Sequence, residues 1–420
     1  MTAPPALSSP AVSSPRLLPL VCRICHAAYD AAPVAICEQC LGPLEPQYDP
    51  ERWLPDPEVI SRRPPTLWRY REWLPFEGAP ALSQDTGFTP LFESPALAAL
   101  LGVARVWIKN DSVSHPSLSF KDRVVATAIN AAHAFRLDTV GCASTGNLAN
   151  AVAAHAARAG LAAWIFVPAD LELGKIVGTA IYHPRLVRVR GTYDDVNRLC
   201  SQVADRFRWG LVNVNLRAYY AEGSKTVAFE IAEQLGWRLP TAVVAPMAGG
   251  SLVTKLKKGF EEFLAAGLVV GRLPKLFGAQ AEGCAPIARL VERGGQAIEP
   301  VIPSTIARSL AIGNPADGLF AARAIWETGG WVGTPSDEDL VAGIRLLART
   351  AGVFAETAGG VVVAAAQALA KAGRLGPSDE VVLCITGNGL KTIEAVQGSL
   401  PNEATIAPKL REVEALVGVT

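Results

Sequence analysis

From Phe88 onwards, short apolar runs alternate with alanine-rich stretches of helical length. These runs lack the polar–apolar alternation of a half-exposed strand, as in VWIK (106–109), TVGCA (139–143), AAWIFV (162–167), AVVAP (242–246) and EVVLCIT (380–386). Continuous apolar strands are typical of parallel sheets, because the crossover helices cover both faces of such a sheet. The pattern therefore predicts an α/β fold built on mostly parallel sheets.

About nine strand–helix units follow one another, which is more than one sheet comfortably holds. We therefore expect two three-layer α/β/α subdomains with mostly parallel sheets and a cleft between them. Further strands are expected at LVRVR (186–190), LVNVN (211–215) and KLFGAQ (275–280). Helices are expected from Phe120, Asn147, about Leu173, Asp194, about Glu222 and Ser251, and near 316–328, 336–350 and 359–372.

Composition divides the chain into three parts. Residues 1–19 are rich in Pro, Ser and Ala with little to bury, which predicts a disordered tail. We expect residues 20–48 to form a four-cysteine, zinc-ribbon-like module and residues 49–420 to form the core of the protein. Within that core, we expect a smaller subdomain at about 115–230 and a larger one from the remainder.

Charge and hydropathy exclude several classes of partner. The 39 acidic and 39 basic residues give a formal net charge of zero, which argues against general binding to nucleic acid or to a membrane surface. No apolar run approaches the ~18–20 residues of a membrane span. The N-terminus lacks the basic and apolar regions of a secretory signal, so we expect a cytoplasmic protein.

Four of the eight cysteines form a C-x₂-C-x₁₁-C-x₂-C pattern: Cys22, Cys25, Cys37 and Cys40. In a reducing compartment, two such knuckles supply the four thiolates of a tetrahedral zinc site. Four thiolates leave no coordination position for water, so a bound zinc ion would be structural. A knuckle held by packing alone is the alternative. The other four cysteines are expected to be small core residues.

Polar, glycine-rich loops follow three of the expected strands. Ser144, Thr145 and Asn147 follow the strand at 139–143, the segment Ala248–Leu252 (AGGSL) follows the strand at 242–246, and a turn begins at Thr386. Ligands of open α/β sheets bind at the carboxyl ends of strands, and amides at a helix start can hold a phosphate. Each loop alone is also ordinary turn chemistry. Together they predict a site for a phosphorylated cofactor.

Lys121 lies in the segment SFKDR, where the spacing of Ser119 and Asp122 indicates a capping box. The first turn of a helix disfavours an ammonium group, so the pKa of Lys121 should be depressed. A depressed pKa makes the amine a better nucleophile, able to form an imine with an aldehyde. A solvated surface lysine next to a cap is the alternative interpretation.

These motifs resemble those of the fold-type II pyridoxal-phosphate enzymes, the tryptophan synthase β-like family, and within it the threonine synthase family. The resemblance covers residues 20 to 400 approximately. It rests on SFKDR, on ASTGNLANAVAAHAARAG from Ala143, on NVNLRAYYAEGSKT from Asn213, on SLAIGNPADG from Ser309 and on ITGNGLK from Ile385. HPSLS before the lysine and AGGSL in the phosphate loop depart from the family's commoner NPTGS and GNAGN.

The resemblance implies a role for each loop. Lys121 would hold pyridoxal 5'-phosphate as a Schiff base and move protons. Asn147 would meet the cofactor's phenolic oxygen, and Thr386 its pyridine nitrogen. The backbone of Ala248, Gly249, Gly250, Ser251 and Leu252 would hold its phosphate.

The implied substrate is O-phospho-L-homoserine, converted with water to L-threonine and phosphate by γ-elimination and β-addition of water. Arg217 and Lys225 are nominated for the substrate phosphate, and Ser144 and Thr145 for the substrate carboxylate. For Arg217 and Lys225, the alternative is an exposed charge pair at a helix entry.

A homodimer is common for such folds. Rival functions are another fold-type II lyase, such as a threonine dehydratase or a cysteate-synthase-like enzyme, a zinc-ribbon interaction protein, and a cofactor-binding pseudoenzyme.

Overall fold

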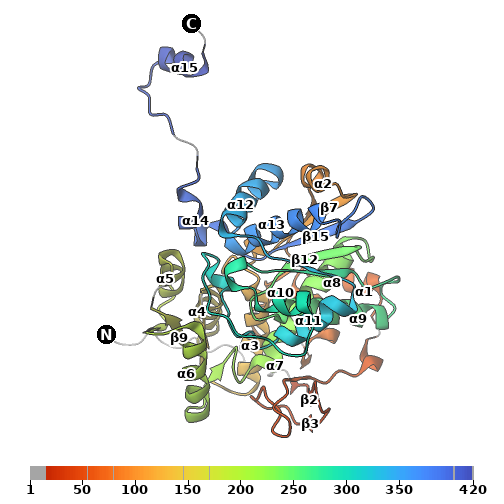
Figure 1. The fold of residues 1–420 in the computed structure, drawn as a ribbon. Coiled ribbons are helices and arrows are strands. Elements are labelled where there is room, and N and C mark those ends of the chain that lie inside the picture. Colours follow the sequence, from red (N-terminus) through yellow and green to blue (C-terminus); the bar gives the residue numbers. More distant parts are fainter. Residues whose placement is uncertain are drawn as a thin grey trace.

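Two parallel sheets organise the protein (Figure 1). The structure, a computed structural model, describes residues 16–53, 55–78, 80–144, 146–169, 171–400 and 403–418. The larger sheet has the order β14 (Val332–Gly333), β13 (Lys275–Ala279), β12 (Ala242–Pro246), β15 (Glu380–Ile385), β7 (Arg105–Asn110) and β6 (Leu91–Glu93). The smaller sheet has the order β10 (Arg185–Val189), β9 (Ala162–Pro168), β8 (Thr139–Ala143) and β11 (Gly210–Leu211). All pairs are parallel except β6–β7, so the expected α/β fold of two parallel-sheet subdomains is confirmed.

Both faces of the larger sheet are buried, as its apolar strands require. Along β15, Val381 and Leu383 pack into one hydrophobic core, and Val382 and Cys384 pack into the other. One face is covered by α2 (Pro95–Leu101), α12 (Asp337–Ala351) and α13 (Thr357–Lys371). The other is covered by α8 (Thr226–Gln234), α9 (Ser251–Ala265), α10 (Pro286–Arg293) and α11 (Gly318–Glu327).

The smaller sheet is also a middle layer. Cys142 and Ile165 face α3 (Lys121–Ala134) and α4 (Asn147–Ala159), whereas Ala143 and Phe166 face α6 (Tyr193–Arg206). Helix α5 (Leu173–Ala180) packs on α4, and α7 (Arg217–Glu222) packs on α3. The left part of Figure 1 shows these layers.

The strand expected at 211–215 is only partly present, because β11 ends at Leu211. Asn213 binds the backbone of Ala143 through both its amide oxygen and its amide nitrogen, at 3.2 and 3.1 Å. The Asn215 side chain accepts a hydrogen bond from the Leu211 N–H at 2.8 Å. These side chains satisfy backbone groups that a longer ladder would have used, so the chain turns here instead.

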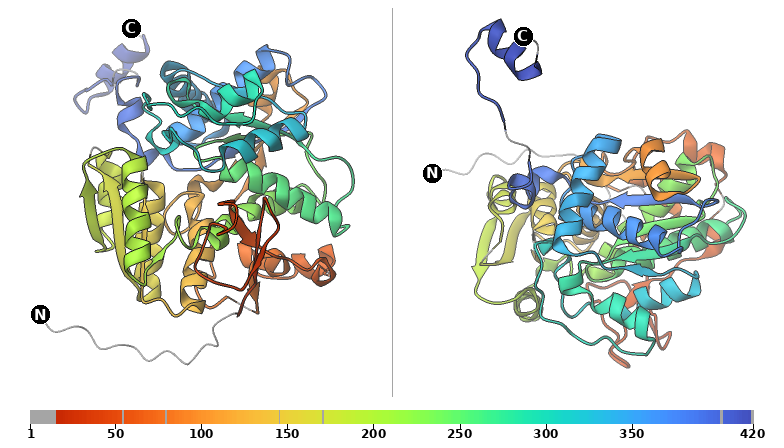
Figure 2. Two further views of the ribbon diagram at one scale, coloured as in Figure 1. Left: turned by 60° about the horizontal axis from the view of Figure 1, so that its bottom comes forward. Right: turned by 45° about the horizontal axis from the view of Figure 1, so that its top comes forward.

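The N-terminal module packs on the core as a small antiparallel sheet. Its strands are β3 (Ala28–Tyr29), β2 (Leu20–Cys22) and β4 (Leu44–Pro46). Residues 16–19 belong to the predicted disordered tail, yet β1 (Arg16–Leu17) pairs with β5 (Phe76–Glu77). The rest of that predicted tail, residues 1–15, lies outside the described residues. Figure 2 shows this module lying against the helices of the core.

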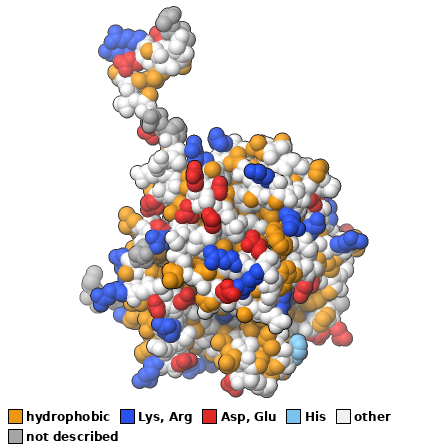
Figure 3. All heavy atoms as spheres, viewed as in Figure 1, with side chains coloured by type: hydrophobic (Ala, Val, Ile, Leu, Met, Phe, Trp, Pro, Cys, Tyr) orange, Lys and Arg blue, Asp and Glu red, His pale blue; other side chains and the backbone are white. Residues whose placement is uncertain are grey.

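The remaining elements are short connectors and a C-terminal arm. The connectors are α1 (Pro57–Ser61), α14 (Glu394–Gln397) and the 3-10 turns η1 (Pro50–Arg52), η2 (Leu67–Trp73), η3 (Asp111–Val113), η4 (Gly223–Lys225), η5 (Glu282–Cys284), η6 (Arg308–Leu310) and η7 (Gly389–Lys391). Helix α15 (Leu410–Val417) stands away from the body in Figures 1 and 2. Among the described residues, no helix is long and apolar enough to cross a membrane. Acidic and basic side chains are interspersed on the face drawn in Figure 3.

Candidate active site and four-cysteine cluster

A cavity of about 210 Å³ lies where the carboxyl ends of strands from both sheets meet. Its lining includes residues that directly follow β8, β12 and β15, as the rule for open α/β sheets predicts. The predicted site residues that line it are Lys121, Ser144, Asn147, Arg217, Ala248, Gly249, Gly250, Ser251, Leu252 and Thr386. Thr145 lies outside the described residues.

Lys121 is the first residue of α3, and its Nζ donates a hydrogen bond to Tyr220 Oη at 3.3 Å. Burial lowers the pKa of Lys121 to about 8, and the nearby carboxylate of Glu356 only partly opposes this shift. A lowered pKa was expected, although removal from water is its main cause. Near neutral pH, an appreciable share of this amine is therefore uncharged and able to attack a carbonyl carbon.

The capping box that was expected at Ser119 and Asp122 is only half present. The Asp122 carboxylate accepts from the Ser119 N–H at 3.4 Å, but the Ser119 hydroxyl caps nothing and is buried without a partner. The backbone of Ser119 and Phe120 is bonded instead to the loop after β15. The Phe120 N–H donates to the Thr386 carbonyl at 2.9 Å, and Ser119 forms an isolated antiparallel β-bridge with Gly387. The loop that carries Thr386 and the helix that carries Lys121 are thus joined directly.

Asn147 begins α4, and its side chain is held from two sides. Its amide nitrogen donates to Glu356 Oε1 and Oε2 at 2.7 and 2.9 Å, and its amide oxygen accepts from Lys391 Nζ at 3.2 Å. Burial lowers the pKa of Lys391 to about 8. We did not expect a role for Glu356 from the sequence, although a lone carboxylate beside the apolar stretch TAGGVVVAAA was a usable signal.

The loop Ala248–Leu252 has the geometry of an anion site. Helix α9 starts at Ser251, and Gly250 before it has a φ of 92°, which favours glycine. A Cβ on Gly250 would lie 2.9 Å from the Asp317 carbonyl oxygen, so a larger residue does not fit. The unpaired N–H groups of the first turn of α9 are available to a phosphate at this edge of the cavity.

The residues nominated for the substrate differ in their positions. The Ser144 hydroxyl accepts from the Gly146 and Ala149 N–H groups, both at 2.9 Å, so it caps the start of α4 while lining the cavity. Arg217 also lines the cavity, and its guanidinium pairs with Asp317 Oδ2 at 2.7 Å. This carboxylate raises the pKa of Arg217 above its usual value.

Lys225 is not among the described residues that line the cavity, so the structure does not bring this nominated phosphate ligand together with Arg217. Its side chain is fully buried, with Nζ 2.7 Å from Glu222 Oε2 and 2.9 Å from Glu262 Oε1. It is Ser224, one residue earlier, that lines the cavity. Ser224 and Lys225 lie in the 3-10 turn η4, where successive residues point about 120° apart, so Lys225 faces away from Ser224 and into an internal ion cluster.

Asp317 is a second site residue that the sequence did not reveal. It sits at the start of α11, and its N–H donates to the Gly249 carbonyl at 3.0 Å while its carboxylate pairs with Arg217. It therefore connects the anion loop to Arg217, the residue nominated for the substrate phosphate that lines the cavity.

The residues around the cavity fit a phosphorylated aldehyde. They supply a glycine loop at a helix start for the phosphate, a lysine of lowered pKa for the aldehyde, and polar side chains at Asn147 and Thr386.

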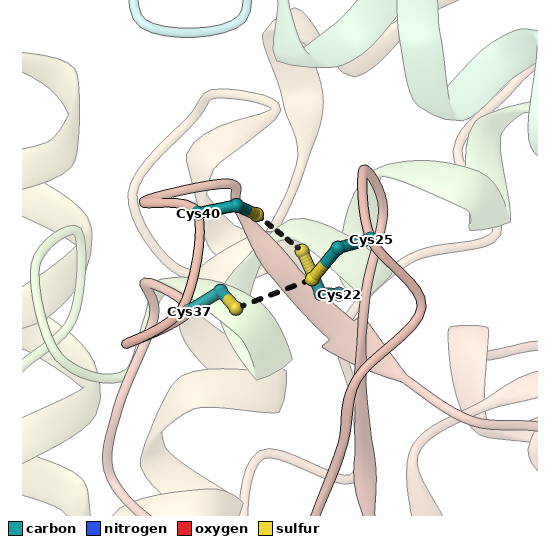
Figure 4. A group of neighbouring side chains, drawn as sticks. All are labelled: Cys22, Cys25, Cys37 and Cys40. Carbon is teal, nitrogen blue, oxygen red and sulfur yellow. Dashed lines mark hydrogen bonds between the residues drawn. The ribbon is translucent and has the colours of Figure 1, made fainter.

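The four cysteines of the N-terminal module converge, as Figure 4 shows. Their sulfur atoms all lie within 4.8 Å of one another, with Cys22 Sγ 3.4 Å from Cys40 Sγ and Cys25 Sγ 3.6 Å from Cys37 Sγ. Tetrahedral zinc–thiolate bonds of ~2.3 Å place sulfurs roughly 3.8 Å apart, so the cluster can hold a zinc ion. A hydrogen bond from Tyr29 lowers the pKa of Cys37 to about 6, which favours its thiolate.

Comparison with known proteins agrees with this geometry. The family model described as "Pyridoxal-phosphate dependent enzyme" matches residues 82–387. The chain is 35% identical to the threonine synthase of Methanosarcina acetivorans over 381 residues, covering 90% of this chain and 93% of that protein. It is 34% identical to the threonine synthase of Methanocaldococcus jannaschii over 380 residues, covering 89% and 93% of the two chains.

Solved structures with this fold include a maize serine racemase, with a TM-score of 0.62 at 20% identity, covering 75% of this chain and 93% of that one. A diaminopropionate ammonia lyase from Escherichia coli has the same TM-score and identity, covering 74% and 86%. At this identity, the likeness concerns the fold alone.

Proposed function

Since the chain belongs to the pyridoxal-phosphate-dependent enzymes and, within them, to the threonine synthase family, we propose that it converts O-phospho-L-homoserine and water to L-threonine and phosphate. The observation that carries the proposal is Lys121, an amine with a pKa of about 8 that lines the same cavity as the anion loop and Arg217. The reaction needs these parts together: an amine that moves protons, and separate sites for two phosphate groups.

Lys121 is proposed as the residue that moves protons. When bound, pyridoxal phosphate supplies an aldehyde that captures amines and a ring that withdraws electrons from the substrate carbons. With its pKa of about 8, the Lys121 Nζ can carry one proton at a time, removing one from Cα and one from Cβ of the substrate and giving one to Cγ and one to Cα. The hydrogen bond to Tyr220 Oη would hold Nζ in place from one proton transfer to the next.

The cofactor would be held on three sides by this chain. The backbone of Ala248 to Leu252 would bind its phosphate, Asn147 would meet its phenolic oxygen, and Thr386 its ring nitrogen. A hydroxyl at Thr386, in place of a carboxylate, does not hold the ring as a pyridinium. The bound ring would therefore withdraw electrons less strongly, which suits a reaction in which the phosphate leaves from Cγ.

Arg217 is proposed as the ligand of the substrate phosphate, with Ser144 and Thr145 nearer the substrate carboxylate. Arg217 suits this role because its guanidinium lines the cavity and can bind phosphate oxygens bidentately. Lys225 is not proposed as a ligand, because its side chain is buried and paired with Glu222 and Glu262.

The decisive assay compares two substrates in the holoenzyme. Release of phosphate from O-phospho-L-homoserine together with formation of threonine supports the proposal, whereas release of ammonia from threonine supports a threonine dehydratase-like lyase. Lys121→Ala should abolish either reaction, since no other amine is proposed for the chemistry. Phosphate release that persists in Lys121→Ala would contradict the role given to this lysine.

We also propose a cytoplasmic homodimer, following what is common for this fold. Light scattering of the purified full chain measures the mass directly, and a single species at the monomer mass of 44.3 kDa contradicts the dimer.

A further inference from the structure

The four-cysteine module lies against the wall of the active site, and its residue Arg23 approaches Asp317. Arg23 Nη1 is 4.0 Å from Asp317 Oδ1, while Arg217 Nη2 is 2.7 Å from Asp317 Oδ2. One carboxylate thus stands between an arginine of the module and an arginine of the cavity. The backbone of the same aspartate holds the anion loop at Gly249.

The position of Arg23 is restricted on several sides. It lies between Cys22 and Cys25, and its N–H donates to the Pro43 carbonyl at 3.0 Å. Its guanidinium stacks over the Phe320 ring of α11 with 4.0 Å to the ring centre, and lies 3.9 Å from Glu45. Its side chain is 22% exposed, which is little for an arginine on a surface module.

A small cavity of about 20 Å³ marks the joint between the module and the core. Arg23 and Glu45 line it from the module, and Arg217, Asp317 and Lys255 line it from the core. This volume is roughly that of a single water site, so the facing charges interact with little solvent between them.

A second set of ion pairs clamps the module to the helix that carries the anion loop. Glu45 of β4 lies 3.1 Å from Lys255 Nζ and 2.9 Å from Lys258 Nζ, both on α9. Burial opposes ionisation of Glu45, but Lys255 and Lys258 outweigh it and lower its pKa to about 2. The module is therefore held in one place relative to Arg217.

We propose that Arg23 is a positioning and specificity residue for the substrate phosphate, acting through Asp317 on Arg217. Without Arg23, the Asp317 carboxylate would neutralise Arg217, and the pair would offer no net charge to a phosphate. With Arg23, two arginines share the Asp317 carboxylate, and this group carries a net positive charge suited to a dianion, because Glu45 beside Arg23 is already paired with Lys255 and Lys258. This inference rests on the proposed role of Arg217.

The test compares Arg23→Gln, Arg23→Lys and Arg52→Gln in the full-length holoenzyme. Arg52 serves as the matched control, because it pairs with Glu77 on the surface, 44% exposed. For Arg23→Gln, we expect the KM for O-phospho-L-homoserine and the inhibition constant for inorganic phosphate to rise roughly tenfold, with kcat and cofactor absorbance within about twofold. Arg23→Lys should bring both constants most of the way back to their original values, and Arg52→Gln should match the unmodified enzyme.

Several outcomes would overturn the proposal. One is a KM and a phosphate inhibition constant within twofold of the unmodified enzyme in Arg23→Gln. Another is a rise in KM that Arg23→Lys does not reverse. A third is an effect of Arg23→Gln on kcat alone, with KM unchanged. Arg217→Ala separates the two hypotheses, because an unchanged KM there refutes the role of Arg217 itself. If the enzyme does not act on O-phospho-L-homoserine, titration of inorganic phosphate into the holoenzyme still measures the effect of Arg23→Gln on anion binding.

Discussion

The Asn147 amide donates to both carboxylate oxygens of Glu356, two residues 209 positions apart in the chain. Lys391 holds the other end of the same amide. Asn147 is therefore oriented by charges from the start of α13 and from the turn η7 after β15, and Glu356 also lies close enough to Lys121 to raise its pKa slightly against the effect of burial.

The pH dependence of cofactor capture should report the pKa of Lys121. Only the neutral amine attacks an aldehyde, and burial lowers this pKa to about 8, so the neutral fraction increases up to and through pH 8. The rate at which apoenzyme captures pyridoxal phosphate, followed by visible absorbance, should be half-maximal near pH 8 and fall about tenfold per pH unit below pH 7. A midpoint near pH 10 would contradict this, and Lys121→Ala should show no covalent capture.

Replacing Glu356 by Gln should move that midpoint to lower pH. The carboxylate raises the pKa of Lys121, so its removal leaves burial unopposed and lowers this pKa further. The same absorbance measurement over a pH series detects the shift. Glu394→Gln, at an exposed position of α14, is the control and should leave the midpoint unchanged. An upward shift in Glu356→Gln would refute the electrostatic link.

Gly250 and Gly249 should respond differently to replacement by alanine. At Gly250, the φ of 92° and the close Asp317 carbonyl should cost about 1–3 kcal/mol of folding free energy in the apoenzyme. At Gly249, no atom lies within 4 Å of an added Cβ, so the stability of the apoenzyme should be unchanged. Denaturant unfolding of both apoenzymes checks this, and equal stability of the two variants contradicts the geometry described for the loop.

The buried ion cluster behind Lys121 should be essential for stability. Glu230 accepts hydrogen bonds from Arg123 and from Lys109, the latter at 2.6 Å, and all three side chains are buried. Glu230→Gln leaves buried cations without their counter-charge and should cost about 3–5 kcal/mol of unfolding free energy. Glu261→Gln, an exposed partner of Lys257, should cost less than about 1 kcal/mol in the same unfolding experiment. Similar values for the two variants would show that burial does not matter here.

The four-cysteine module should bind one zinc ion per chain. Elemental analysis of protein purified under reducing conditions measures the stoichiometry, and Cys25→Ser should reduce it because three thiolates hold the ion less tightly. Cys200→Ala is the control, since Cys200 is a buried residue of α6 and is not part of the four-cysteine cluster. Metal-free protein with an unchanged melting temperature would favour a module held by packing alone.

Much of the site was predictable because its parts are local. The lysine at a helix start, the glycine loop after an apolar strand and the paired cysteine knuckles each follow from a few neighbouring residues. The rule that ligands bind at the carboxyl ends of parallel strands then brings Lys121, Asn147 and Thr386 to one cavity.

Charge pairing was not predictable in the same way. Arg217 and Lys225 share one short segment and looked equivalent, yet one pairs with Asp317 at the cavity and the other with Glu222 and Glu262 in the interior. A difference of this kind depends on which side of the helical turn each residue faces and on what packs there. The missing N-cap bond from the Ser119 hydroxyl has a similar origin, because the loop after β15 pairs with the Ser119 backbone.

The sequence by itself determined the alternation of strands and helices, the loops that bear the chemistry, the thiol cluster and the family. Hydrophobic periodicity and turn residues act over a few positions, so they can be read along the chain. Only the tertiary structure decided that Glu356 orients Asn147, that Asp317 joins the anion loop to Arg217, and that Arg23 reaches the same carboxylate. These contacts join residues many tens of positions apart, and the burial that makes such charges interact strongly exists only after the chain has packed.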